Sequence, residues 1–400
     1  MTKPSDVKVV GPLLPFVSGF IEELAGLGYS PLSAANQVRV LAHLSRWMVA
    51  EDIDGGGLGP GQVAEFLRAR RDAGYTCWLS ERGLGPLLSF LRGVGAVPAV
   101  ATPVIEGPLE ELLDAYRGYL KSERGLVAGT VSRRISTARL VLAPYEGLNE
   151  TPIEALTAPG VRDFVVRECS VRKIGSARLL MSELRCLLRF LFVSGRVASD
   201  LSLVVPAVAG HGGWAPKGVD RGVVARLLAG CDTRTPVGSR DHAILVLLIR
   251  LGLRAGEVAA LSLEDIDWRA GEITVVGKGN RHERLPLPVD VGEALVGYLH
   301  HRRRSAHRSV FIQARAPHNP ITTGAIKMVV RQACVRVGVL VIGPHRLRHS
   351  AATDMLRAGA SLNEVGQVLR HRGTATTAIY AKADPAALRS LALPWPGQTR

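Results

Sequence analysis

The first half of the chain repeats one helical pattern, and this repeat limits the fold more than any other feature of the sequence. Three segments with apolar residues at helical spacing return in the same order about one hundred residues later. The pairs are "GYSPLSAANQVRVLAHLSRWM" from Gly28 with "GLVAGTVSRRISTARLVL" from Gly125, "LGPGQVAEFL" (58–67) with "LTAPGVRDFV" (156–165), and "LLSFLRGVGAV" (87–97) with "LLRFLFVSGRV" (187–197). We therefore predict two related helical bundles, with chance similarity between amphipathic helices as the alternative.

Two stretches rich in Pro and Gly divide the chain into three parts. They are "VPAVATPVIEG" (97–107) and "VVPAVAGHGGWAPKG" (204–218), and both are typical of linkers. A chain of 400 residues also exceeds what one hydrophobic core usually holds. We expect an N-terminal helical domain over residues 1–105, a second helical domain over 106–213 that it duplicates, and a third domain over 214–400 that ends in a tail helix.

The third part of the chain mixes helical and strand patterns. "RDHAILVLLIRLGLRAGEVAALS" predicts a long apolar helix, and "GEITVVGKGNRHERLPLPV" alternates apolar and polar residues around a Gly-Lys-Gly-Asn turn. Such alternation around a glycine-containing turn indicates a β-hairpin. The predicted fold class is mainly α: helical bundles followed by a mixed α/β domain with a small antiparallel sheet.

Positive charge is concentrated in this third part. The whole chain carries a formal net charge of +15. Residues 217–400 hold 27 Lys and Arg against 14 Asp and Glu, a net +13, which leaves +2 for the first 216 residues. A basic excess confined to one domain favours a polyanionic partner, of which nucleic acid is the commonest. A basic surface without a partner is the alternative.

Other features narrow the class of protein. The longest apolar run, "AILVLLIRLGL", is interrupted by Arg250, and the N-terminus lacks the layout of a signal peptide. We therefore expect a cytoplasmic protein without a membrane segment. The five cysteines are scattered and form no CxxC pair, so we expect reduced core thiols and neither a disulfide framework nor a zinc site.

Five motifs in the basic part carry side chains suited to phosphate chemistry. They are "GLRAGEV" with Arg254 and Glu257, "GKGNR" with Lys278, "HRLRH" with His345 and Arg348, "LRHRG" with His371, and "TTAIYAK" with Tyr380. Arginines bind phosphate oxygens through two parallel hydrogen bonds and stabilise the charge of the transition state without a metal ion. Lysine and histidine can transfer protons, and a tyrosine beside cations is a usable nucleophile. The set predicts a phosphodiester substrate.

Each of these residues also has an ordinary structural interpretation. Arg254 could pair with Glu257 at i+3, Lys278 could be a plain hairpin lysine, and Tyr380 could belong to a core. The two histidines of "HRLRH" have the i, i+4 spacing of zinc ligands. Arg346 and the second arginine of that motif would repel the dication, and no third ligand is evident, so we expect neither metal nor cofactor.

In their order, the motifs closely resemble the catalytic domain of the tyrosine recombinases, or phage integrase family, over roughly residues 218–382. The resemblance implies that Arg254 and Arg348 bind the phosphate, with Glu257 as an accessory acid. It implies that Lys278 is the general acid and that His345 assists proton transfer. It also implies that His371 donates a hydrogen bond and that Tyr380 is the nucleophile. One position departs from the family, because Arg370 stands where glycine is usual. It is expected either to crowd the turn before the next histidine or to add a phosphate contact.

The resemblance also implies how the chain works. A helical, SAM-like core-binding domain precedes the catalytic domain in that family, and residues 109–204 fit its place. The implied enzyme is a site-specific DNA recombinase, integrase or transposase that forms a covalent 3′-phosphotyrosine without metal or ATP. It would act as a homo-tetramer on two double-stranded DNA sites, with accessory proteins as further candidate partners. The alternatives are a type IB topoisomerase and a non-catalytic DNA-binding regulator.

Overall fold

The computed structural model of the chain describes residues 3–98, 107–145, 153, 156–208, 218–277, 281–303, 305 and 307–370. The chain forms two compact units, one made of residues 1–99 together with 214–400 and the other of residues 100–213. The division into three domains that the linkers suggest stays a prediction. Among the described helices, none combines the length and the hydropathy that a membrane span requires.

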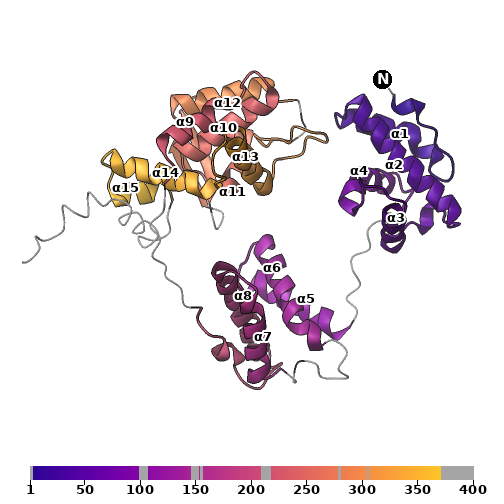
Figure 1. The fold of residues 1–400 in the computed structure, drawn as a ribbon, viewed down its shortest axis with the longest axis horizontal. Helices are drawn as coiled ribbons and strands as arrows, with labels where there is room; N and C mark the ends of the chain where they lie inside the picture. The colour runs from indigo at the N-terminus through magenta and orange to yellow at the C-terminus, as the bar shows by residue number, and fades with distance from the viewer. Residues whose placement is uncertain are drawn as a thin grey trace, which may run out of the picture. The chain divides into compact units, whose positions relative to one another are not determined.

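The first ninety-nine residues contain a bundle of four α-helices (Figure 1). They are α1 (Val17–Gly26), α2 (Pro31–Ala50), α3 (Pro60–Asp72) and α4 (Glu81–Gly93). Helix α2 begins as the sequence predicts, because the side chain of Ser30 accepts a hydrogen bond from the Ser33 N–H and Pro31 occupies the first turn. Phe20, Leu41 and Leu87 are fully buried in one core that draws on α1, α2 and α4.

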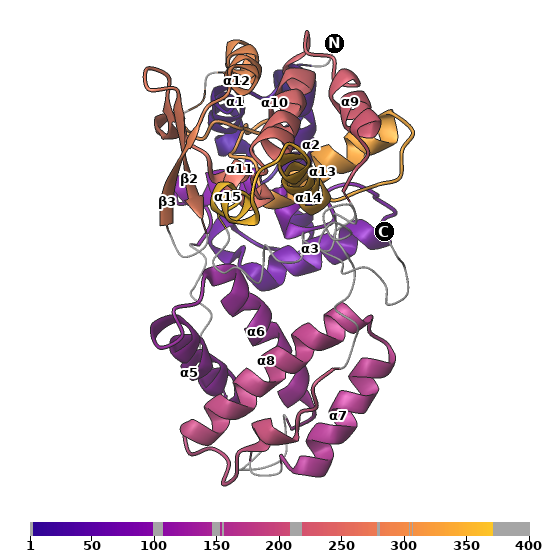
Figure 2. The same ribbon diagram turned by 90° about the vertical axis from the view of Figure 1, so that its left-hand side faces the viewer.

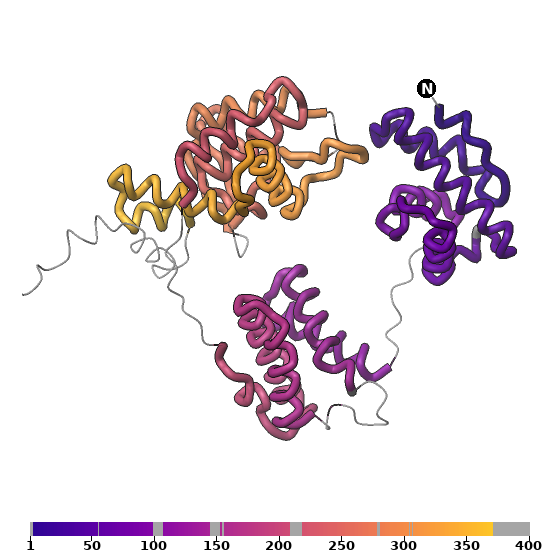
Figure 3. Tube along the Cα trace, viewed as in Figure 1, coloured from indigo at the N-terminus to yellow at the C-terminus, as the bar shows by residue number. Residues whose placement is uncertain are grey.

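Residues 100–213 contain a second bundle of α-helices, traced in Figure 3. They are α5 (Pro108–Ser122), α6 (Ala128–Leu142), α7 (Ala158–Ser170) and α8 (Ile174–Val193). Tyr116, Leu184 and Leu188 lie in its core. The three repeated segments fall on α2 and α6, on α3 and α7, and on α4 and α8. The helical order that the repeat predicts is therefore confirmed.

The third part of the chain surrounds one buried helix. Its α-helices are α9 (Arg221–Ala229), α10 (Pro236–Arg250), α11 (Ala255–Ala260), α12 (Val289–His301), α13 (Thr323–Arg336), α14 (Pro344–Arg357) and α15 (Leu362–Val368). Helix α10 contacts α9, α11, α12, α13 and α14, and Ile244, Leu247 and Leu248 on it are fully buried. This packing explains the apolar run, which fills a core because helices contact it on several sides. The single long helix predicted over 240–262 is wrong in its extent: α10 ends at Arg250 and α11 begins at Ala255, because Gly252 between them takes a φ of +58°.

A small antiparallel sheet lies beside these helices, with β1 (Ile266–Asp267), β2 (Glu272–Gly277) and β3 (Arg281–Pro286) in sequential order. Figure 2 shows β2 and β3 side by side. Gly277 pairs with Arg281, so three residues connect the two strands. Both the predicted hairpin and the predicted fold class, mainly α with a small antiparallel sheet, are confirmed.

Candidate active site

The "HRLRH" motif forms the first turns of α14. The helix begins at Pro344, whose fixed backbone and missing N–H suit the first helical position. His345 and His349 lie one turn apart, with ring centroids 4.7 Å from each other in an edge-to-face arrangement. The i, i+4 spacing of the two histidines therefore brings their rings together on one face of the helix.

Arg348, between the two histidines, is almost completely buried, with 2% of its surface exposed. Its Nη1 donates to the Gly252 carbonyl at 2.5 Å, and its Nη2 donates to the Leu369 carbonyl. The guanidinium thus joins the turn before Arg254 to the turn before His371. An arginine that bridges two motifs far apart in sequence fixes their relative positions.

Arg254 is the residue before α11, and Glu257 lies three residues later. The carboxylate of Glu257 accepts a hydrogen bond from the Arg254 backbone N–H at 2.7 Å and another from its Nη1 at 2.6 Å. The pairing that the sequence offered as the ordinary structural interpretation is therefore present. It does not remove the arginine from solvent, because 36% of the Arg254 side chain remains exposed while Glu257 is 4% exposed.

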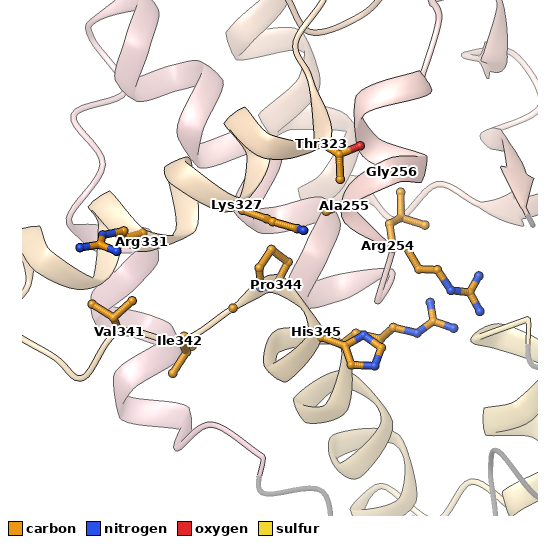
Figure 4. A pocket seen from close by; sticks show the side chains of 13 residues that line it. Arg254, Ala255, Gly256, Thr323, Lys327, Arg331, Val341, Ile342, Pro344 and His345 are labelled. Atoms are coloured by element: carbon orange, nitrogen blue, oxygen red, sulfur yellow. The ribbon is translucent and has the colours of Figure 1, made fainter. Parts of the chain in front are cut away.

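Arg254, His345 and Arg348 line one cavity of about 600 Å³. Figure 4 shows the Arg254 guanidinium and the His345 imidazole at the same end of it. Lys327 and Arg331, one turn apart on α13, also line the cavity, and Figure 4 shows Lys327 extending toward α11. Among the described residues that line the cavity, none is Asp or Glu. The cavity therefore presents positive charge to whatever enters it.

The positive surroundings determine the protonation states of the site. Burial, followed by the charges of Arg348 and Arg254, lowers the pKa of His345 below its usual 6.5. Burial and the neighbouring His345, Arg348 and Arg346 lower the pKa of His349 to about 4. His345 is therefore neutral near pH 7 and can accept a proton.

Glu257 remains ionised although it is buried. Burial by itself raises the pKa of this carboxyl, but the Arg254 N–H, the charge of Arg370 and the Arg254 guanidinium outweigh it and lower the pKa below the usual value. The carboxylate is therefore a permanent negative charge behind the cavity, not in it.

Arg370 adopts a backbone conformation usual for glycine and buries its side chain. Its φ of +55° is the left-handed conformation that glycine adopts freely, so the arginine takes the backbone shape of the family's usual residue. Its side chain is 2% exposed, and its Nη2 donates to Glu257 at 2.7 Å. In this structure the guanidinium is turned inward to a carboxylate, and Arg370 is not among the described residues that line the cavity.

Three of the predicted site residues lie outside the described residues. Lys278 falls in the connection between β2 and β3, His371 follows Arg370 directly, and Tyr380 is nine positions further along the chain. Within the residues that are described, no group of three or more His, Cys, Asp or Glu side chains could hold a metal ion.

Sequence reasoning missed Lys327 and Arg331. Their i, i+4 spacing on a helix was the available signal, but in a basic domain the same spacing usually marks a solvated face. Their place at the cavity follows from the packing of α13 against α11 and α14. A single sequence does not display that packing.

Comparison with known proteins identifies relatives along the whole chain. The model of the phage integrase family matches residues 218–387. A protein of Sinorhizobium fredii named as the integrase/recombinase y4rA is 38% identical over 400 residues, which cover 98% of this chain and 96% of that protein. The tyrosine recombinase XerC of Pseudomonas aeruginosa is 33% identical over 275 residues, covering 68% of this chain and 90% of the relative. Among solved structures, a lambda integrase tetramer bound to a Holliday junction is similar at a TM-score of 0.53 and 16% identity, covering 74% of this chain and 85% of the other.

Proposed function

This chain belongs to the phage integrase family and is a tyrosine recombinase, an enzyme of site-specific DNA strand breakage and rejoining; from this premise we propose that its cationic cavity holds the scissile phosphate. One observation carries the proposal. Arg254 and Arg348, from motifs about ninety residues apart, meet at a cavity whose described lining has no carboxylate. A phosphodiester supplies the negative charge that this lining lacks.

Cleavage then proceeds in one displacement at phosphorus. The Tyr380 oxygen attacks, forms the bond to phosphorus and gives its proton to neutral His345, while the bond from phosphorus to the 5′-oxygen breaks. Lys278 protonates the departing 5′-oxygen, and His371 donates a hydrogen bond to the phosphate. The products are a 3′-phosphotyrosine and a free 5′-hydroxyl.

Charge stabilisation comes from the two arginines. The pentacoordinate transition state carries more negative charge on its non-bridging oxygens than the ground state does, so fixed cations bind it more tightly. Glu257, the accessory acid, holds Arg254 from behind. The phosphotyrosine retains the energy of the broken bond, so the 5′-hydroxyl of a second strand can attack it and rejoin the DNA without ATP.

Strand exchange between two duplexes needs four cleavages, so the active assembly is four protomers on two double-stranded DNA sites. The lambda integrase tetramer on a Holliday junction supports this arrangement. In this proposal residues 106–213 form the core-binding domain, and residues 1–105 form a further helical domain that contacts additional DNA or a neighbouring protomer. The tail helix predicted near the C-terminus lies outside the described residues, and its proposed role is to dock on that neighbour. Accessory proteins set the direction, and the reaction takes place in the cytoplasm.

The decisive experiment uses Tyr380→Phe. Inverted repeats in the DNA beside the gene provide the candidate site, and a duplex nicked within that site traps the covalent intermediate. We expect wild type to form a protein–DNA adduct on a denaturing gel and Tyr380→Phe to form none. DNA affinity should change by no more than a few-fold, since it arises from many phosphate contacts. An adduct in the Phe variant would assign the nucleophile to another residue.

The same site distinguishes the remaining functions. A type IB topoisomerase would relax supercoiled plasmid as a monomer, and a non-catalytic regulator would keep full function as Tyr380→Phe. Neither is favoured, because the relatives along this chain are named as recombinases. Recombinant product from two plasmids that carry the site, absent with Tyr380→Phe, is the outcome that we expect.

A further inference from the structure

We propose that Arg370 is a positioning residue that holds Glu257, and through it Arg254, in the geometry needed to bind the scissile phosphate. The inference rests on the proposed function of the cavity. It concerns a side chain that the phosphate chemistry itself does not use.

The backbone of Arg370 is the first observation. A φ of +55° crowds the Cβ of any L-residue against its own backbone, whereas glycine adopts this conformation freely. The turn itself therefore requires no side chain, and its hydrogen bond from the Arg370 N–H to the Gln367 carbonyl at 2.9 Å would form equally with glycine. What arginine adds is its guanidinium.

The guanidinium is committed to the interior. Its Nη2 lies 2.7 Å from the Glu257 Oε2, and the two side chains are 2% and 4% exposed. Its Nη1 donates to the Val368 carbonyl at 3.1 Å. A buried ion pair of this kind contributes little net stability, but removing one partner leaves the other charge uncompensated. The arrangement is suited to fixing geometry.

Glu257 is shared between two arginines. One carboxylate oxygen, Oε1, accepts from Arg254 Nη1, and the other, Oε2, accepts from both the Arg254 N–H and Arg370 Nη2. Because both oxygens belong to one rigid plane, holding Oε2 also sets the direction of Oε1. Two cations also share a single anion, so Arg254 is only partly neutralised and keeps positive charge for the cavity.

Arg370 also connects this pair to the other catalytic segments. Its carbonyl accepts from Arg254 Nη2 at 3.4 Å, and the adjacent Leu369 carbonyl accepts from Arg348. The buried Nε of Arg370 has no hydrogen-bond partner within the described residues. It lies 3.8 Å from a carboxylate oxygen of Glu283 on β3, the strand that follows the connection containing Lys278. The turn at residues 369–370 therefore contacts both cavity arginines immediately before His371.

The test measures DNA affinity and single-turnover cleavage separately on the nicked duplex described above. Arg370→Gly keeps the left-handed turn and removes only the side chain. We expect its cleavage to slow by about 10²-fold, the size of effect that a misplacement near 1 Å produces, with affinity unchanged within a few-fold. Arg370→Lys keeps the charge and should recover part of the rate. Arg370→Asn, which also tolerates positive φ, repeats the test if thermal unfolding shows that the Gly variant has lost its fold.

A double-mutant cycle with Glu257→Gln identifies the route of the effect. If Arg370 acts through Glu257, Arg370→Gly/Glu257→Gln will cleave no more slowly than Glu257→Gln alone. Three results would each overturn the positioning role. The double variant could show the product of the two single rate losses, or Arg370→Gly and Arg370→Asn could both cleave at the wild-type rate. The third result is a loss of DNA affinity as large as the loss of rate.

Arg254→Ala separates this inference from the proposed function. An Arg254→Ala variant that cleaves at the wild-type rate would refute the phosphate site itself, and with it the role of Arg370. If Arg254→Ala is inactive while both neutral variants of Arg370 cleave normally, the phosphate site stands and only the positioning role fails.

Discussion

Gly252 offers a quantitative test of how tightly the two arginine motifs are joined. Its φ is +58°, and a Cβ built there would lie 2.6 Å from Leu369 Cδ2 and 3.4 Å from Ala351 Cβ. Gly252→Ala should lose about 1–2 kcal/mol from the left-handed conformation and about 1–3 kcal/mol from overpacking. We therefore expect a total loss near 2–5 kcal/mol in the free energy of unfolding of this part of the chain.

Gly271 is the matched control. Its φ is +64°, but among the described residues no atom beyond its own chain neighbours lies within 4 Å of the position of its Cβ. Gly271→Ala should therefore lose only the conformational share, about 1–2 kcal/mol. Alanine also lowers the conformational entropy of the unfolded chain relative to glycine. This effect is the same in both variants, so it cancels when their free energies of unfolding are compared. That difference, about 1–3 kcal/mol, measures the collision with the Leu369 side chain.

Amide hydrogen exchange of α10 is the appropriate assay. The chain has more than one compact unit, so a single denaturation curve does not isolate the catalytic part. The buried amides of α10 exchange only when that part opens, and their protection gives its free energy of opening. Cleavage should fall as well, because the carbonyls of Gly252 and Leu369 both accept from Arg348. Equal loss of protection in Gly252→Ala and Gly271→Ala would refute the packing described here.

Three further results are expected on the nicked duplex. Cleavage should continue in EDTA, since two arginines supply the positive charge, and recovery of lost activity on adding magnesium or zinc would contradict this assignment. A substrate with sulfur at the 5′-bridging position should restore cleavage by Lys278→Ala but not by Arg254→Ala, because a thiolate leaves without a proton. General-acid catalysis is typically worth about 10²–10⁴-fold, so the restored rate should be easy to measure. Rescue of both variants, or of neither, would remove Lys278 from that role. The pKa of His345 is lowered from its usual 6.5, so if His345 accepts the tyrosine proton, cleavage should stay level from neutral pH down to about 6.5 and decline only at lower pH. A decline beginning above pH 7 would show that His345 is not the group that titrates.

Local pattern was sufficient for most of the fold. The Ser30-Pro31 start of α2, the apolar periodicity of α10 and the hairpin of β2 and β3 each depend on residues near one another in sequence, and all are present, although the predicted long helix is broken between Arg250 and Ala255. The i+3 spacing also offered the contact between Arg254 and Glu257 as an ordinary structural interpretation, and that contact is present. Capping, periodicity and turn chemistry act over a few residues, so a single sequence displays them.

The contacts that complete the site are of another kind. Glu257 and Arg370 are separated by 113 positions, and Arg348 and Gly252 by 96. Nothing near Arg370 in the sequence reveals its positive φ or its inward direction, since both depend on where α11 packs. Its position before a histidine box suggested a crowded turn or a phosphate contact, and neither alternative pointed to the buried pair with Glu257.

The buried position of the Glu257 carboxylate explains how a site can be strongly basic and still well ordered. Like charges at close range repel, and the repulsion between Arg254, Arg348 and Arg370 would separate their segments if nothing opposed it. Glu257 opposes it from the buried side, and the carbonyls of Gly252 and Leu369 oppose it around Arg348. No Asp or Glu is among the described residues that line the cavity, so this compensation does not extend to the face that meets DNA. The positive charge left on that face is fixed before the phosphate arrives, and a fixed charge needs no reorganisation as the transition state forms.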